Sequence, residues 1–251
     1  MENQAKRFKP VWVFPLLYIL GMGVSNLIVR QVYRANYVDA VYIRSVLPFL
    51  TALAVFSVIC SLTVKRQRAS ESPKQGNVLL FLFLFLPLAG LTLYYWALRA
   101  QLSTAFFLPL AVALLVGVGE ELMFRYILFG GLLRAQGQSF RNAVLFSAAL
   151  FSLLHSVNIL AGMPLQQMLI QMGTTFLAGL FFALMYDYTK SIFLMIVFHG
   201  LWDYLLISDA AQVIPSFGSI FLVLSILQIL LIPVLVIRKH RLGAAGERGI
   251  S

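Results

Sequence analysis

The residues with the greatest chemical potential in this sequence are ionisable side chains inside long apolar stretches. They are Glu120, Glu121, Arg125, His155, His199 and Asp203. A charged side chain at the centre of a membrane-spanning helix costs about 2.5–3.5 kcal/mol on insertion scales, so such residues usually face a bundle interior and mark a functional site. Carboxyl and imidazole groups together can activate water or stabilise a developing negative charge.

The first group lies in the segment GEELMFR. Glu121 and Arg125 are four residues apart with the acid first, which favours an ion pair on a helix. Glu120 points elsewhere around the helix and has no obvious local partner. It is therefore our candidate general base. The alternative is that all three residues form a structural ion cluster that holds helices together.

The second group is FSLLH, in which Phe151 and His155 are also four residues apart and share a helical face. The ring of Phe151 can therefore pack beside the imidazole. Taken alone, a histidine near a helix end favours a structural interpretation.

The third group is HGLWD, which places His199 and Asp203 one helical turn apart. A carboxylate on the same face can orient an imidazole and select its tautomer. A structural His–Asp pair between helices is the alternative. His240, in the basic segment VIRKHR, is interpreted as solvated charge.

The arrangement leaves two catalytic chemistries open. The sequence contains no HExxH and no GxSxG motif, so a zincin helix and a nucleophile elbow are absent. A divalent ion such as zinc could be held by Glu120, His155 and His199. The same groups could instead hold a water molecule without a metal, and we prefer this mechanism, which requires no cofactor. The single cysteine, Cys60, is expected to be a small buried apolar residue.

The composition indicates an all-α, polytopic membrane protein. Hydrophobic residues make up 61% of the 251 residues and charged residues only 11%, whereas soluble domains carry about 25% charged residues. The net charge of +10 comes from residues in short connections rather than from a basic and aromatic face, so a nucleic-acid partner is not expected. The lipid bilayer is the expected environment.

Eight apolar stretches are long enough, or nearly so, to cross a bilayer, which takes about 20 residues. They cover residues 11–29, 46–64, 78–98, 105–133, 143–157, 165–186, 192–207 and 217–237. The fourth is long for one crossing and is expected to tilt or to break near Gly130 and Gly131. The fifth and seventh are short, and each contains a histidine.

The basic residues predict how these spans are oriented. With the N-terminus inside, fourteen Lys and Arg residues fall in inner segments and only Arg30, Arg34 and Arg99 in outer ones. The positive-inside rule therefore places residues 1–10 and a basic tail, 238–251, in the cytoplasm, with one transmembrane domain between them at 11–237. We expect a multi-pass protein of a prokaryotic plasma membrane, with both termini cytoplasmic.

The three motifs together resemble those of the CPBP family, which contains the type II CAAX prenyl endopeptidases and the Abi-type proteins. EELMFR fits EExxxR, FSLLH fits FxxxH and HGLWD fits HxxxN/D, in that order. The resemblance covers about residues 105–206. It implies an intramembrane protease, often labelled a metalloendopeptidase, that acts on a hydrophobic or lipid-modified peptide, including CAAX-type substrates.

The resemblance also implies a role for each matched residue. Glu120 would activate water with the help of His155, while His199 and Asp203 would stabilise the oxyanion. Glu121, Arg125 and Phe151 would be supporting residues. Type II CAAX proteases typically have Asn where this chain has Asp203. Because an ionised carboxylate repels an oxyanion, Asp203 must be protonated or must serve to orient His199.

Two other classes of function are compatible with the same residues. One is a non-catalytic membrane partner, such as a bacteriocin-immunity or regulatory protein, that uses the charges for packing. The other is a small proton-coupled transporter, against which the lack of a repeated half with broken helices argues.

Overall fold

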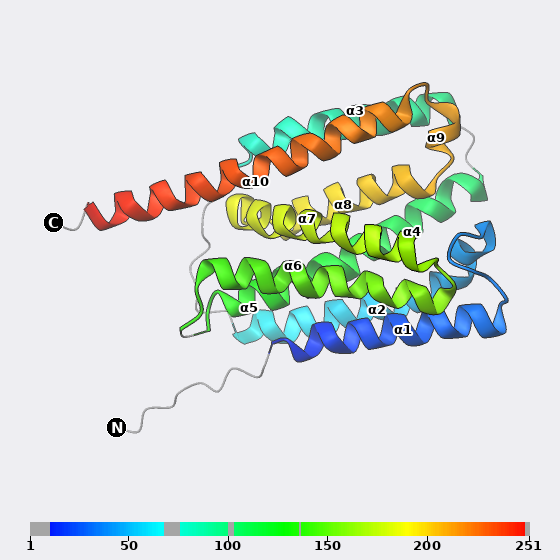
Figure 1. The fold of residues 1–251 in the computed structure, drawn as a ribbon, viewed down its shortest axis with the longest axis horizontal. Helices are drawn as coiled ribbons and strands as arrows, with labels where there is room; N and C mark the ends of the chain where they lie inside the picture. Colours follow the sequence, from blue (N-terminus) through cyan, green and yellow to red (C-terminus); the bar gives the residue numbers. More distant parts are fainter. Residues whose placement is uncertain (1–10, 68–75, 100–102, 136, 249–251) are drawn as a thin grey trace.

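The computed structural model describes residues 11–67, 76–99, 103–135 and 137–248, and within these ranges the regular structure is entirely helical. Figure 1 shows long helices running side by side in a single bundle. The predicted all-α fold is confirmed. The long elements are α1 (Val13–Val32), α2 (Ala40–Gln67), α3 (Leu79–Arg99), α4 (Thr104–Glu120), α6 (Phe140–Ser156), α7 (Leu165–Thr189), α8 (Ile192–Ile207) and α10 (Phe217–Arg248).

Short elements join or extend these helices. A π-helix, η1 (Glu121–Phe129), and a final turn, α5 (Gly130–Leu132), continue α4. A 3₁₀ turn, η2 (Val157–Ala161), continues α6, and α9 (Ala210–Val213) lies between α8 and α10.

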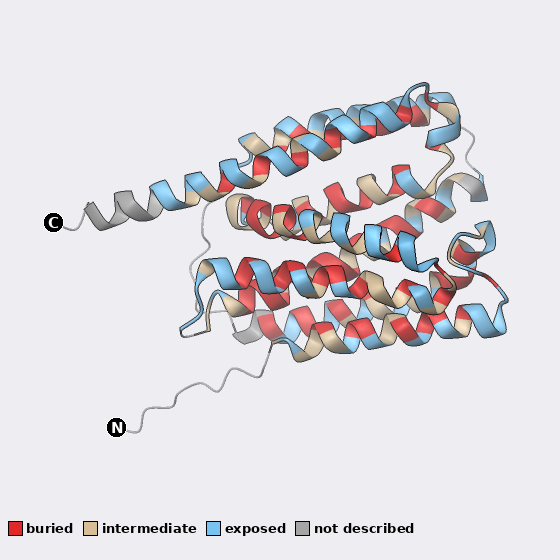
Figure 2. Cartoon of the chain, in the orientation of Figure 1, coloured by how far each residue is buried: buried red, intermediate tan, exposed pale blue. Residues whose placement is uncertain are grey.

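The apolar surface of the bundle is that of a multi-pass membrane protein. Seven helical segments are long and apolar enough to cross a bilayer, and α8 is a shorter apolar helix of 16 residues. Large apolar side chains face outward, for example Leu20 and Phe193, which are about two-thirds exposed. Figure 2 shows the exposed residues along the outer sides of the helices and the buried ones along their inner sides. This is the pattern expected when lipid replaces water around the protein.

Three helices extend beyond the predicted spans. The second helix begins at Ala40 rather than at residue 46, and the last continues to Arg248, past the predicted end at 237. The fifth span is not short, because η2 extends it to Ala161. The predicted N-terminal segment 1–10, most of the connection at 65–77 and residues 249–251 lie outside the described residues.

The irregularity of the fourth span is a π-helix rather than a break. The chain remains helical through Gly130 and Gly131, so the predicted break there is wrong. Instead, the nine residues of η1 adopt the wider i→i+5 hydrogen-bond pattern. Because π-helical turns are rare and occur frequently at functional sites, the position of η1 within the GEELMFR segment is informative.

The two ends of the bundle carry different connections and ion pairs. Figure 1 shows that α1 begins and α10 ends at the same end of the bundle, here called the terminal end. The α1–α2 connection and α9 lie at the opposite end, here called the α9 end. At the terminal end, Asp187 forms ion pairs with Lys190 and with Lys239. At the α9 end, Arg99 pairs with Asp209 at 2.6 Å.

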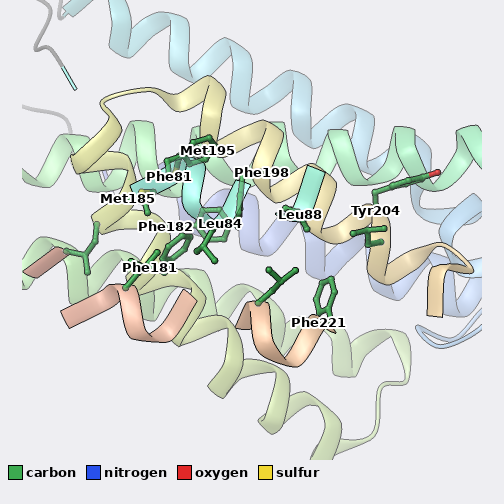
Figure 3. Close-up of a cluster of buried hydrophobic side chains, with 14 of the residues drawn as sticks. Phe81, Leu84, Leu88, Phe181, Phe182, Met185, Met195, Phe198, Tyr204 and Phe221 are labelled. Atoms are coloured by element: carbon green, nitrogen blue, oxygen red, sulfur yellow. The ribbon is translucent and has the colours of Figure 1, made fainter. Parts of the chain in front are cut away.

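Aromatic packing fills much of the interior. One buried cluster, shown in Figure 3, combines side chains of α3, α7, α8 and α10, including Phe81, Phe181, Phe198 and Phe221. The ring centroids of Phe81 and Phe198 lie 6.0 Å apart and those of Phe181 and Phe198 5.8 Å apart. These contacts hold α8, which carries two of the predicted site residues, against its neighbours.

A glycine allows α4 to approach α8 closely. A Cβ atom at Gly117 would lie 2.9 Å from the Ile196 carbonyl oxygen and 3.3 Å from the Gly200 nitrogen, both backbone atoms of α8. Backbone atoms cannot move aside as a flexible side chain can. The distance between the two helices that carry Glu120 and His199 therefore depends on this position.

We expect Gly117→Ala to push α4 and α8 apart and to lower the free energy of unfolding by about 1–3 kcal/mol, as overpacking does. The matched control is Gly173→Ala in α7, where an added Cβ meets nothing within 4 Å. Thermal melting of both variants in detergent tests this expectation. Equal melting temperatures for the two variants would contradict it.

Candidate active site

Four predicted site residues line a single cavity. The cavity has a volume of about 830 Å³ and is bordered by α2, α4, α7, α8 and α10, with further residues from the α1–α2 connection and from α6. Glu120 comes from α4, His155 from α6, and His199 and Asp203 from α8. Three separate helices thus bring two acids and two imidazoles to a common space, together with Phe151.

The imidazole of His199 lies among three carboxyl groups. Its Nδ1 atom is 2.8 Å from Oε1 of Glu121, a buried hydrogen bond between α8 and η1. Its Nε2 atom is 3.4 Å from Oδ2 of Asp203 and 3.8 Å from Oε2 of Glu120. Because a carboxylate accepts, Nδ1 of His199 donates to Glu121. Nε2 is then the nitrogen available on the side of the two cavity-lining carboxyls.

The predicted ion pair between Glu121 and Arg125 is confirmed. Nη1 of Arg125 lies 3.2 Å from Oε1 of Glu121, and neither side chain has exposed surface. The guanidinium also lies over two aromatic rings, 3.9 Å from the Phe151 centroid and 4.9 Å from that of Phe182. Such cation–π contacts are strongest where water is excluded. This pair lies behind the cavity rather than in its wall.

The helical transition at Glu120 separates two adjacent carboxyl groups. Glu120 is the last residue of α4 and lines the cavity, whereas Glu121 is the first residue of η1 and faces Arg125. The two acids therefore occupy different environments although they are neighbours in the chain. Glu120 is 8% exposed, and its Oε2 atom has no hydrogen-bond partner among the described residues.

His155 is fixed by its own helix. Its Nδ1 atom lies 3.0 Å from the Phe151 carbonyl oxygen. A carbonyl only accepts, so the proton of the neutral ring is on Nδ1 and the lone pair on Nε2. The predicted packing of Phe151 beside His155 is confirmed, with ring centroids 5.3 Å apart. Phe151 also lies 6.1 Å from the ring of His199, so it packs beside both imidazoles.

Two residues near the site could not be found from the sequence. Phe182 of α7 contacts both Arg125 and the ring of His199, the latter with centroids 5.1 Å apart. The sequence contains 21 phenylalanines, and no local pattern distinguishes Phe182 from the others. Tyr18 of α1 is the second. A Cβ added at Gly119 would meet its hydroxyl at 2.6 Å, so α1 packs directly on the glycine that precedes Glu120.

The donor atoms do not form a metal site in this arrangement. Within the described residues, no group of three or more His, Cys, Asp and Glu side chains is placed to hold a metal ion. The suggested ligands Glu120, His155 and His199 all line the cavity, and the bond from Nδ1 of His199 to Glu121 leaves Nε2 of that ring available.

Comparison with known families agrees with the motifs. Residues 101–205 match the family model described as type II CAAX prenyl endopeptidase Rce1-like. The predicted resemblance to the CPBP family, which includes the CAAX-type proteases, is confirmed for this segment, which contains all three motifs. No curated protein and no solved structure matches the chain. The helices outside the matched segment nevertheless contribute to the cavity, through Tyr42 of α2 and Gln228 of α10 among others.

We expect Arg125→Met to lower the free energy of unfolding by about 3–5 kcal/mol, because it leaves the Glu121 carboxylate buried without its cation. The double variant Glu121→Gln/Arg125→Met should recover part of that loss. Arg99→Met is the control, since its pair with Asp209 is about half exposed and such pairs contribute about 0–1 kcal/mol. Thermal melting in detergent is the measurement. An Arg125→Met protein that melts with the wild type would show that the cluster does not stabilise the bundle.

Proposed function

We propose that this protein is an intramembrane endopeptidase that hydrolyses a peptide bond with a water molecule activated by Glu120. The observation that carries the proposal is the convergence of Glu120, His155, His199 and Asp203 on one cavity from three helices. The family match supports the same class of reaction. A purely structural ion cluster would not require these four groups to face an open space, as they do here.

Glu120 is suited to remove a proton from water. Its side chain borders the cavity, and its Oε2 atom has no hydrogen-bond partner among the residues described. His155 can accept the second water hydrogen at Nε2, because Nδ1 is engaged by the Phe151 carbonyl. The water oxygen then attacks the carbonyl carbon of the peptide, and a C–O bond forms as the proton passes to Glu120.

His199 is suited to stabilise the oxyanion that results. Glu121 accepts the Nδ1 proton and holds the ring in place, and the Arg125 cation in turn neutralises Glu121. In the protonated ring, Nε2–H can donate to the oxyanion. When the intermediate collapses, the C–N bond breaks and the proton held by Glu120 moves to the leaving nitrogen. The products are a carboxylic acid and an amine.

The surroundings of the cavity favour a hydrophobic or lipid-modified peptide. Most of its lining side chains are apolar, among them Val46, Leu50, Val116 and Phe221. An apolar chain loses water when it enters such a space, which contributes about 25 cal/mol per Å² of buried apolar surface. The few polar groups would then orient the scissile bond.

Glu120→Gln should lower peptide cleavage by at least about 10²-fold, because an amide cannot accept the proton from water. Cleavage of a peptide panel in liposomes, with and without a chelator, is the measurement, and the chelator should have no effect. Asp209→Asn is the control, since this acid lies at the α9 end in contact with Arg99. Equal cleavage by wild type and Glu120→Gln would instead favour the non-catalytic membrane partner. Loss of cleavage with the chelator would show that a metal takes part.

Asp203→Asn should retain cleavage within about tenfold of wild type, whereas Asp203→Leu should lose about 10²-fold. The reason is that a neutral group at this position, 3.4 Å from Nε2 of His199, can donate to an oxyanion, and an amide can replace a protonated acid there. Steady-state cleavage rates of the two variants test this. If Asn is as inactive as Leu, a carboxylate is required to orient or charge His199.

A further inference from the structure

The cavity reaches the surface of the described residues at the α9 end of the bundle. Its lining includes residues 37–39 of the α1–α2 connection and Ala40, the first residue of α2, and this connection lies at the α9 end. Val38 and Ala40 are exposed, and Val38 has 67% of its surface accessible. The cavity-lining residues of α10 belong to the first half of that helix, and those of α7 lie between Gln171 and Phe182. Both helices begin at the α9 end (Figure 1).

The half of the bundle toward the terminal end is closed by apolar packing. Beyond Glu121, η1 contributes Met123, Phe124, Ile127, Leu128 and Phe129, each with no exposed surface. From the adjoining helices, Phe181, Met185, Met195 and Phe198 are at most 1% exposed, and Figure 3 shows them gathered in one cluster. A hydrated path to the terminal end would have to pass through this packing.

Polar side chains instead line the route from the α9 end. Tyr42 donates to Oδ1 of Asn26 at 2.6 Å, and Asn26 donates to Asn158 at 3.2 Å. Asn158 in turn donates to Gln171 at 2.9 Å, and Gln171 to the hydroxyl of Tyr37 at 3.3 Å. All except Asn26 border the cavity. This connected network provides hydrogen-bonding groups between the rim and the catalytic residues, as a polar peptide backbone requires.

The distribution of basic residues assigns these ends to the two sides of a membrane. Only four Lys and Arg residues adjoin the α9 end, namely Arg30, Arg34, Arg44 and Arg99. Fourteen adjoin the terminal end in sequence, namely Lys6, Arg7, Lys9, Lys65, Arg66, Arg68, Lys74, Arg134, Arg141, Lys190, Arg238, Lys239, Arg241 and Arg248. Short basic connections remain in the cytoplasm. The α9 end is therefore the extracytoplasmic one.

We propose that the cavity takes its substrate from the extracytoplasmic side of the membrane. The occupant is a polypeptide segment that is exposed on that face and anchored there by an apolar or lipid-modified part. This inference rests on the proposed peptidase function for the identity of the substrate, but the side on which the cavity opens follows from packing and charge alone. A prenylated C-terminus that remains in the cytoplasm would approach the closed half of the bundle.

Single cysteines test the side of the opening without any assay of activity. The native Cys60 is buried and is replaced in a Cys60→Ala background. Val38→Cys then marks the rim of the cavity and Ile43→Cys its wall. Gln138→Cys marks an exposed position between α5 and α6 at the terminal end. In intact cells, a membrane-impermeant maleimide should label the first two at least about tenfold more than Gln138→Cys, which should react fully only after permeabilisation. The reverse pattern would overturn the proposal.

A second experiment tests passage of the substrate. The purified Val38→Cys and Gln138→Cys proteins are modified with a bulky polymer-linked maleimide, and peptide cleavage in detergent is compared before and after modification. Cleavage should fall at least fivefold for Val38→Cys and remain unchanged for Gln138→Cys. Inhibition through Gln138→Cys alone would overturn the proposed route. If unmodified protein cleaves no peptide, the peptidase function fails, while the labelling pattern still decides which way the cavity opens.

Discussion

The buried contact of Glu121 with both Arg125 and His199 is the interaction on which the rest of the site depends. One carboxylate, without exposed surface, neutralises the guanidinium at 3.2 Å and accepts from the imidazole at 2.8 Å. Burying charge is costly unless it is paired, so these three groups constrain η1 and α8 to a single relative position. The other components of the cavity are arranged around this fixed point.

The wide helical turn of η1 makes that contact compatible with catalysis. Consecutive acids in a regular helix would point about 100° apart in any case, but here the change of helix type falls between them, with Glu120 closing α4 and Glu121 opening η1. One acid is thereby committed to structure and the other is left facing the cavity. The close approach of α4 to α8 at Gly117 brings the free acid within 3.8 Å of Nε2 of His199.

Aromatic rings pack around the buried charged groups of the site. Phe151 contacts Arg125, His155 and His199, while Phe182 contacts Arg125 and His199 from α7. These rings exclude lipid and water from the charged cluster and, because their faces attract cations, they also stabilise the guanidinium. The charged groups of the site therefore lie between the closely packed apolar half of the bundle and the half that contains the cavity.

The sequence by itself determined the all-helical membrane fold, because backbone groups inside a bilayer must be hydrogen-bonded within the protein. It also determined the Glu121–Arg125 pair, because side chains four residues apart are neighbours on one helix. It also predicted the contact of Phe151 with His155 for the same local reason. Only the tertiary structure decided that Glu121 rather than Asp203 bonds Nδ1 of His199, that Phe182 completes the cluster, and that the fourth span widens at Glu121 instead of breaking at Gly130. These features depend on contacts between helices, and no periodicity along one chain segment encodes which partner a side chain will meet.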